Sequence, residues 1–137
     1  MKRLLCFAAS AAIALGTGSA AFAQHYVQKN LVANTPGVAP ITDPHLVNPW
    51  GLSRGSGTPW WVSDNVTGLS TLYNGAGAIQ SLVVTIPPTD PTNPKTPTGT
   101  IFNGSATDFL LAPKAPAIFL FSTIDGTIAG WNPGVGG

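Results

Sequence analysis

The stretch NPWGLSRGSGTPWWVSDNVTG, residues 48–68, decides the fold class. It places three tryptophans among glycines, serines and prolines, residues that form turns rather than helices. Elsewhere, short runs of Val, Leu, Ile and Phe are bounded by Gly, Pro, Asn and Asp. Such runs are typical of strands joined by tight turns, and no segment after residue 24 has the apolar period of a surface helix. The sequence therefore predicts an all-β protein.

The expected strands are short and follow one another closely. They are residues 26–32, 60–63, 70–73, 81–86, 99–102, 108–111, 117–121 and 127–131. Residues 87–97 hold five prolines among polar residues and are expected to form a loop.

The chain repeats itself at an offset of about 48 residues, a period that marks repeat architectures. The offset brings residues 49–51 onto 97–99, 61–62 onto 109–110, 71–73 onto 119–121, and the turn at 75–77 close to 124–126. A unit of this length with four antiparallel strands is a β-propeller blade. Since neighbouring blades press together, the tryptophans of the opening stretch are expected to fill the wedge between them.

The predicted organisation has three parts. Residues 1–23 are a signal peptide, residues 24–47 are an N-terminal strand with a lead-in loop, and residues 48–137 are two blades, the second incomplete. A propeller closes with 4–8 blades, which needs roughly 190–380 residues at this blade length. The chain is therefore expected to be part of a longer protein. Two blades alone are expected to be aggregation-prone or only partly ordered, because blades cannot bury their faces singly.

The N-terminus has the pattern of a secretory signal. Lys2 and Arg3 precede an apolar run, and Ala21-Phe22-Ala23 provides the small residues of a signal peptidase site. Cleavage after Ala23 predicts a secreted or periplasmic protein without Cys6, the one cysteine, and hence without a disulfide or a thiolate site. No later run approaches the length of a membrane span, so none is expected.

Charged residues are scarce, at 8% of the chain, and the sequence contains no glutamate. A nucleic-acid-binding protein needs a basic stripe to neutralise phosphates, and a membrane-surface helix needs a basic amphipathic face. The sequence has neither feature. Its partner is therefore expected to be a protein or a small molecule, with self-association as a further option.

Three short motifs are candidates for chemistry. Residues 51–55, GLSRG, fit the G-x-S-x-G nucleophile elbow, but that elbow needs a helix after the serine and residues 55–59 cannot form one. We interpret the motif as a strand and its turn. Four residues before and at the start of the first blade are expected to bind a ligand near a central channel: Asp43, His45, Asn48 and Trp50. The alternative is that Asp43 and Asn48, each followed by a proline, only start turns.

Asp64 and Asn65, which follow a predicted strand, are the candidate metal ligands. Carboxylate and amide oxygens are the hard ligands that calcium prefers. The same two residue types also cap turns through their own backbone, which is the alternative interpretation. No cofactor is expected otherwise, and a divalent cation such as calcium is the alternative.

An ordered set of motifs carries a family resemblance: NPWGL (48–52), STLYNGAG (70–77), VVTIPP (83–88), PTGTIFNG (97–104) and DGTIAGWNP (125–133). They are similar to those of uncharacterised exported bacterial proteins predicted to be NHL-like β-propellers. Members of that family are several times longer, so the resemblance implies that this chain is an N-terminal part of such a protein. It also implies export, and it supplies no catalytic residues. One departure is Ile124, where the family pattern has an acidic residue.

Two functions of different classes follow from these features. The first is an exported, non-catalytic β-propeller that binds or scaffolds, because two histidines and no glutamate leave few groups for acid–base catalysis. The alternative is a lactonase-type hydrolase that holds a divalent ion in the propeller channel. A WD40-type interaction module ranks last, since its repeat is shorter and its Gly-His signature is missing.

Overall fold

The computed structural model describes residues 26–135, which form strands, turns and coil without a helix. The strands make a four-stranded sheet, a three-stranded sheet, a two-stranded hairpin and a short parallel pair. The predicted all-β class is therefore confirmed. The predicted signal peptide lies outside the described residues. Within those residues, no helix is long and apolar enough to cross a membrane.

The first sheet is an antiparallel meander. Its strands, in spatial order, are β3 (Pro49–Ser53), β4 (Trp60–Asp64), β5 (Leu69–Tyr73) and β6 (Val84–Thr85). Gly51 to Ser53 lie in β3 and residues 54–59 form coil and a turn, so the GLSRG motif is a strand and its turn as expected. The predicted strand at 81–86 is reduced to its last part, β6.

The second sheet has three strands, β7 (Pro97–Phe102), β10 (Phe119–Thr123) and β11 (Ile128–Trp131), with β10 in the middle. Between β7 and β10 the chain makes a separate hairpin of β8 (Leu110–Ala112) and β9 (Ala115–Pro116). Residues 87–96 contain no strand, so the predicted loop is confirmed up to the start of β7.

The hairpin shows that the predicted repeat register is wrong beyond its first strand. In the first sheet Pro49 pairs with Asp64, and in the second sheet Pro97 pairs with Thr123. Strand β10 is therefore the counterpart of β4, although the offset had aligned residues 119–121 with part of β5. The cause is the inserted β8–β9 hairpin, which lengthens the second unit between its first two strands.

The two sheets pack face to face around aromatic side chains. The ring of Trp61 stacks on Phe119 with centroids 4.2 Å apart. The ring centroid of Trp131 lies 4.7 Å from that of Trp61. Leu72, Val84, Ile86 and Phe121 complete the buried cluster. Of the three tryptophans expected to fill the space between sheets, only Trp61 does so. Trp60, its neighbour in β4, points to the opposite face of the sheet, and Trp50 is 59% exposed.

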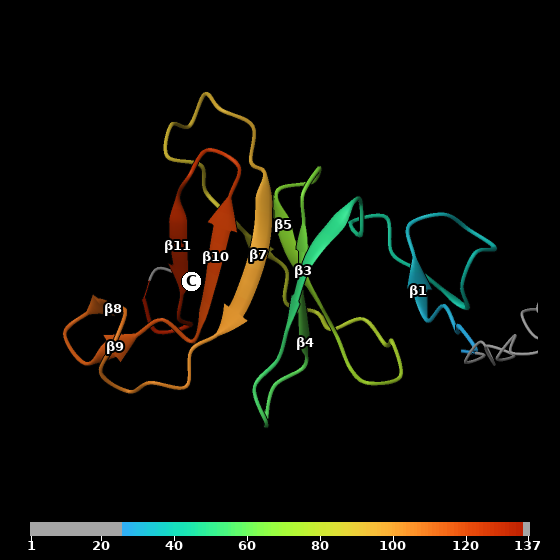
Figure 1. Ribbon diagram of the computed structural model, residues 1–137, viewed down its shortest axis with the longest axis horizontal. Coiled ribbons are helices and arrows are strands. Elements are labelled where there is room, and N and C mark those ends of the chain that lie inside the picture. Colours follow the sequence, from blue (N-terminus) through green and yellow to red (C-terminus); the bar gives the residue numbers. More distant parts are fainter. Residues whose placement is uncertain (1–25, 136–137) are drawn as a thin grey trace, which may run out of the picture.

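Gly51 lets the first strands of the two sheets approach each other closely (Figure 1). A Cβ atom on Gly51 would lie 2.6 Å from both Thr100 N and Thr98 O, which are backbone atoms of β7. Polar contacts also tie β7 to the first sheet: Ser63 Oγ of β4 donates to Gly99 O at 3.4 Å, and Phe102 N donates to Ser53 Oγ of β3 at 3.0 Å. The absence of a side chain at position 51 is thus a condition of this packing.

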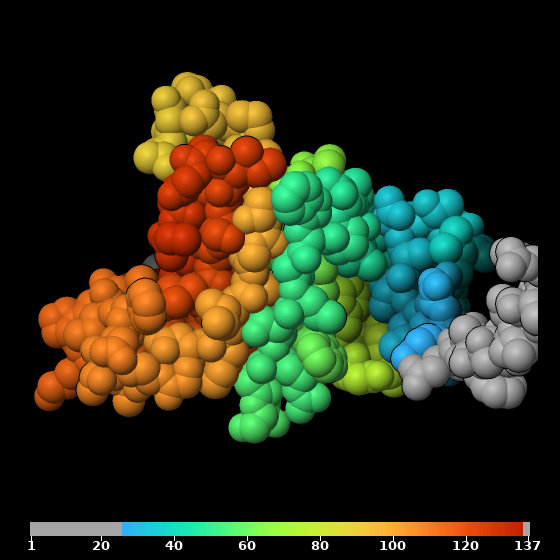
Figure 2. Space-filling model, viewed as in Figure 1, coloured from blue at the N-terminus to red at the C-terminus, as the bar shows by residue number. Residues whose placement is uncertain are grey.

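The lead-in segment, residues 26–47, lies on the side of the first sheet that faces away from the second sheet, so the molecule is elongated (Figures 1 and 2). In it, β1 (Val32–Ala33) pairs in parallel with β2 (Ile41–Thr42). The predicted strand at 26–32 is wrong except for its last residue. Residues 26–30 are exposed and form no strand.

Candidate functional site

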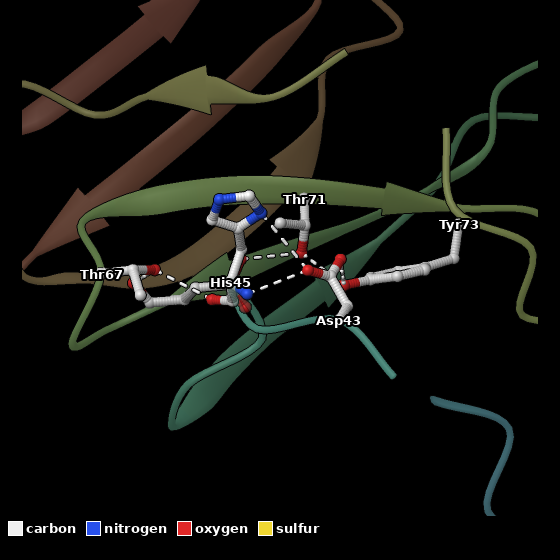
Figure 3. A network of polar contacts seen from close by, with 6 residues as sticks. Asp43, His45, Thr67, Thr71 and Tyr73 are labelled. Carbon is white, nitrogen blue, oxygen red and sulfur yellow. Dashed lines mark hydrogen bonds and ion pairs between the residues drawn. The ribbon is translucent and has the colours of Figure 1, made fainter. Parts of the chain in front are cut away.

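The segment before β3 places Asp43 in a buried position against the first sheet (Figure 3). Only 2% of Asp43 is exposed. The hydroxyl of Tyr73 donates to its Oδ2 at 2.7 Å, and the His45 backbone N–H donates to its Oδ1 at 2.9 Å. Since a buried carboxylate is costly without hydrogen-bond partners, these donors explain how Asp43 is accommodated.

His45 stands beside this carboxylate and reaches solvent. Its Nδ1 lies 3.3 Å from Asp43 Oδ1, while 53% of its side chain is exposed. Its backbone oxygen accepts a hydrogen bond from Thr67 Oγ1 at 3.0 Å, which fixes the loop to the β4–β5 turn. The structure therefore brings together two of the predicted ligand-binding residues as an Asp–His pair with one buried and one accessible member.

A chain of hydroxyl groups links Asp43 to Asp64. Thr71 Oγ1 donates to Asp64 Oδ2 at 2.7 Å, and Tyr73 Oη lies 2.9 Å from Thr71 Oγ1. Thr71 and Tyr73 alternate along β5 and so point to the same face of the sheet. Neither residue was predicted as part of the site, because STLY, residues 70–73, has two polar residues followed by two large ones and shows no polar–apolar alternation.

When Asp43 and Asp64 are both ionised, this row of hydroxyl groups has one proton too few to form all of its hydrogen bonds. It has three oxygen–oxygen contacts, Asp43–Tyr73, Tyr73–Thr71 and Thr71–Asp64, but each hydroxyl brings a single proton. Asp64 Oδ1 is buried and accepts no hydrogen bond from the described residues. Burial raises the pKa of Asp64 from 3.8 to about 7, and burial also raises the pKa of Tyr73. The raised pKa means that Asp64 gains a proton as the pH falls below about 7. When Asp64 is protonated at Oδ2 it donates to Thr71 Oγ1, which leaves the Thr71 hydroxyl proton for Tyr73 Oη.

The raised pKa of Asp64 predicts a pH-dependent stability. Between about pH 4 and 7 the folded protein binds more protons at this group than the unfolded chain does. The free energy of unfolding is thus expected to fall as pH rises through this window, by up to about 1.4 kcal/mol per unit. Urea unfolding at several pH values measures this slope. Asp64→Asn, which stays neutral, is expected to flatten it, and an equal slope in both proteins would contradict the assignment.

Tyr73→Phe tests the other end of the chain. The substitution keeps the ring and removes the one hydroxyl that donates to Asp43 Oδ2. A buried carboxylate oxygen without its donor is expected to lower the free energy of unfolding by about 1–3 kcal/mol. Chemical denaturation at pH 7 measures the effect. An unchanged midpoint would mean that the hydrogen bond contributes nothing to the fold.

Asn48 and Asn65 form a second, separate contact. Asn48 has a left-handed backbone with φ of 53°, and its Nδ2 donates to Asn65 Oδ1 at 3.3 Å. Asn65 Nδ2 in turn donates to Pro97 O at 3.1 Å, so its amide joins the loop to the second sheet. The two predicted metal ligands, Asp64 and Asn65, therefore bond to different partners. Within residues 26–135, no three His, Cys, Asp or Glu side chains gather where they could hold a metal ion.

Trp50, the last predicted ligand-binding residue, lines a groove between the lead-in segment and the first sheet. We call this the aromatic groove; it encloses about 680 Å³ and is lined by Leu31, Trp50, Leu52, Trp60, Val62 and Tyr73, among others. The guanidinium of Arg54 lies 5.3 Å from the ring centre of Trp60, a cation–π distance. Arg54 itself does not line the groove, whose surface is mostly apolar and aromatic, with Asn30 and Asn74 as polar members.

The sequence matches no protein-family model, and no curated protein and no solved structure matches the chain.

Proposed function

We propose that this protein is an exported, non-catalytic scaffold of the β-propeller type, which binds a partner through the aromatic groove. In this proposal the two packed sheets are neighbouring blades of a ring, and the lead-in segment lies where another blade would contact the first sheet. Its export rests on the signal-peptide pattern that ends at Ala23.

The observation that carries the proposal is the way in which the sheets meet. Both are antiparallel sheets whose first strands, β3 and β7, lie against each other, with Trp61 and Phe119 stacked between the sheets. Meandering sheets packed through their faces, with aromatic side chains in the wedge, are the arrangement of propeller blades.

The groove supports binding rather than catalysis. Trp50 and Leu52 expose 59% and 62% of their surface beside the half-buried Trp60. Clustered exposed apolar side chains mark interaction sites. The nearby carboxylates of Asp43 and Asp64 are instead buried in the hydroxyl chain, away from solvent.

The lactonase-type alternative would use Asp64 and Asn65 to hold a divalent ion such as calcium. One oxygen of Asp64 is free of hydrogen bonds, as a ligand oxygen would need to be. However, Asp64 is fully buried and the Asn65 amide is bonded on both sides, so an ion would have to displace Asn48 and Pro97. The geometry therefore supports binding better.

A fluorescence titration of the purified protein with 8-anilinonaphthalene-1-sulfonate, an apolar anion, tests this function. We expect saturable binding at low protein concentration that Trp50→Ala weakens about tenfold, which corresponds to about 1.4 kcal/mol. Val66→Ala, a change at an exposed residue of the β4–β5 turn, is the control and should bind like the parent. Calcium-dependent hydrolysis of a lactone that is lost in Asp64→Asn would instead establish the enzyme.

A further inference from the structure

We infer that the free face of the second sheet binds a second copy of this chain, which docks through its own first sheet, head to tail. By the free face we mean the side turned away from the first sheet, formed by Gly99, Ile101, Leu120, Ser122 and Ile128. Strand pairing places Ile101 beside Leu120 and Ile128 beside Ser122, so these side chains share that side. This inference names the partner of the aromatic groove and rests on the blade-like packing in the proposed function.

The free face of the second sheet resembles the side of the first sheet that packs against the second sheet. In the first sheet Gly51 pairs with Ser63, and in the second sheet the N–H of Gly99 donates to Ser122 Oγ at 2.9 Å. Gly51 leaves room for β7, whereas a Cβ on Gly99 would meet only Ser122 Oγ within 4 Å. The same glycine–serine pair is thus covered by β7 on the first sheet, whereas on the second sheet no neighbouring strand covers it.

The core positions of the two surfaces also correspond. Trp61 pairs with Leu72 in the first sheet, and Leu120 pairs with Gly130 in the second. The space beside Gly130 is taken by Leu111 of the β8–β9 hairpin, because a Cβ on Gly130 would lie 2.8 Å from a Leu111 methyl group. The hairpin therefore supplies the apolar side chain that Leu72 supplies in the first sheet.

The free face is apolar and largely exposed. Ile101 is 60% exposed and Ile128 is 65% exposed. Together with Leu120 and Phe109 they line a shallow depression of about 340 Å³. None of the residues that line it carries a charge. Contiguous apolar surface of this kind mostly serves an interface.

The other end of the molecule offers the matching surface. The outer side of the first sheet carries Trp60 and Tyr73, at the positions that Phe119 and Trp131 take on the inner side of the second sheet. Trp60 pairs with Tyr73 in the same way as Phe119 pairs with Trp131. Tyr73 itself is buried against Asp43 of the lead-in segment, so the exposed Trp50 and Leu52, with the half-buried Trp60, are the groove residues that pack on the free face of another copy. Such a contact joins two different surfaces and leads to a closed ring or an open filament.

Complementary surface variants test this arrangement, with light scattering of the purified protein from about 1 to 100 µM. Leu52→Lys disables the groove and Ile101→Lys disables the free face, and both residues are more than half exposed, so the fold should tolerate the changes. We expect the parent protein to have at least twice the mass of one chain at the highest concentration. Each variant alone should be a monomer, and an equimolar mixture of the two should form dimers and nothing larger. Val66→Lys, outside both surfaces, should associate like the parent.

Near-UV circular dichroism of the tryptophans separates the outcomes. A monomeric parent with a strong tryptophan signal would overturn the self-association while leaving the packed sheets and the binding function intact. A variant that still associates alone would also overturn it, because the contact would then not join these two surfaces. If a lysine variant loses the tryptophan signal, Trp50→Lys and Ile128→Lys replace the pair, and the signal of Trp50→Lys is compared with that of Trp50→Ala, which lacks the same indole.

Discussion

Trp61→Ala is expected to lower the free energy of unfolding by about 3–5 kcal/mol, the range for removing a large aromatic side chain from a core. Trp61 is 3% exposed and contacts Phe119, Phe121 and Trp131 across the interface between the sheets. An alanine leaves a cavity at this position. The two sheets cannot move closer together to fill it, because β3 and β7 are already in contact. Guanidinium unfolding followed by far-UV circular dichroism measures the loss.

Two matched variants make the Trp61 result specific. Trp61→Phe keeps an aromatic ring and removes an indole N–H that is buried without an acceptor, so it should cost less than about 1.5 kcal/mol. Trp50→Ala removes a ring that is 59% exposed and should change stability by no more than about 0.5 kcal/mol. Equal losses for Trp61→Ala and Trp50→Ala would contradict the stacked core.

Gly51→Ala is expected to destabilise the protein by about 3 kcal/mol, an unusually large effect for a single methyl group. The added Cβ would lie 2.6 Å from two backbone atoms of β7, and backbone cannot turn aside as a side chain does. The strands must therefore separate, which also weakens the stacking of Trp61 on Phe119. Urea unfolding and the near-UV tryptophan signal both report this change.

Gly57→Ala is the control for the Gly51 variant. No heavy atom lies within 4 Å of a Cβ at position 57, and its φ is not in the left-handed region. The substitution should be neutral or stabilise the protein by a few tenths of a kcal/mol, since alanine restricts the unfolded chain. A Gly51→Ala protein as stable as Gly57→Ala would mean that β3 and β7 do not approach as described.

The sequence predicted the fold class and most strands because their signals are local. Strands β4 and β5 stand out as apolar runs between turn residues, and the proline-rich loop before β7 is equally plain. The predicted strand at 26–32 failed because a local run of Tyr, Val and Leu does not show where the chain lies relative to other strands. Strand formation depends on a partner, and partners cannot be read from a local pattern.

The repeat register failed for a related reason. The offset that aligns Pro49 with Pro97 is correct for the first strand of each unit, and the β8–β9 hairpin then shifts every later strand. A run such as residues 108–111 has strand propensity in either register. Only the pairing of β10 with β7 distinguishes the inserted hairpin from a strand of the sheet.

The candidate site was predicted in part. Asp43 and His45 are close in sequence, so their contact follows from a short loop. Their link to Asp64 runs through Thr71 and Tyr73, which come from a strand that pairs with β4 well beyond this loop. Burial of Asp64, which sets its pKa, likewise depends on how the lead-in segment folds over the sheet. Contacts of this kind appear only with the three-dimensional structure.

The central claim is that two antiparallel sheets pack face to face through β3 and β7, and an NMR measurement tests it most directly. In the isotope-labelled protein, we expect strong nuclear Overhauser effects between the Gly51 α protons and the Thr100 amide proton, and between the Trp61 and Phe119 rings. These follow from the close approach at Gly51 and from ring centroids 4.2 Å apart. Strand-pairing effects within each sheet without any between these two residue pairs would contradict the packing, and with it the blade-like arrangement on which the proposed function rests.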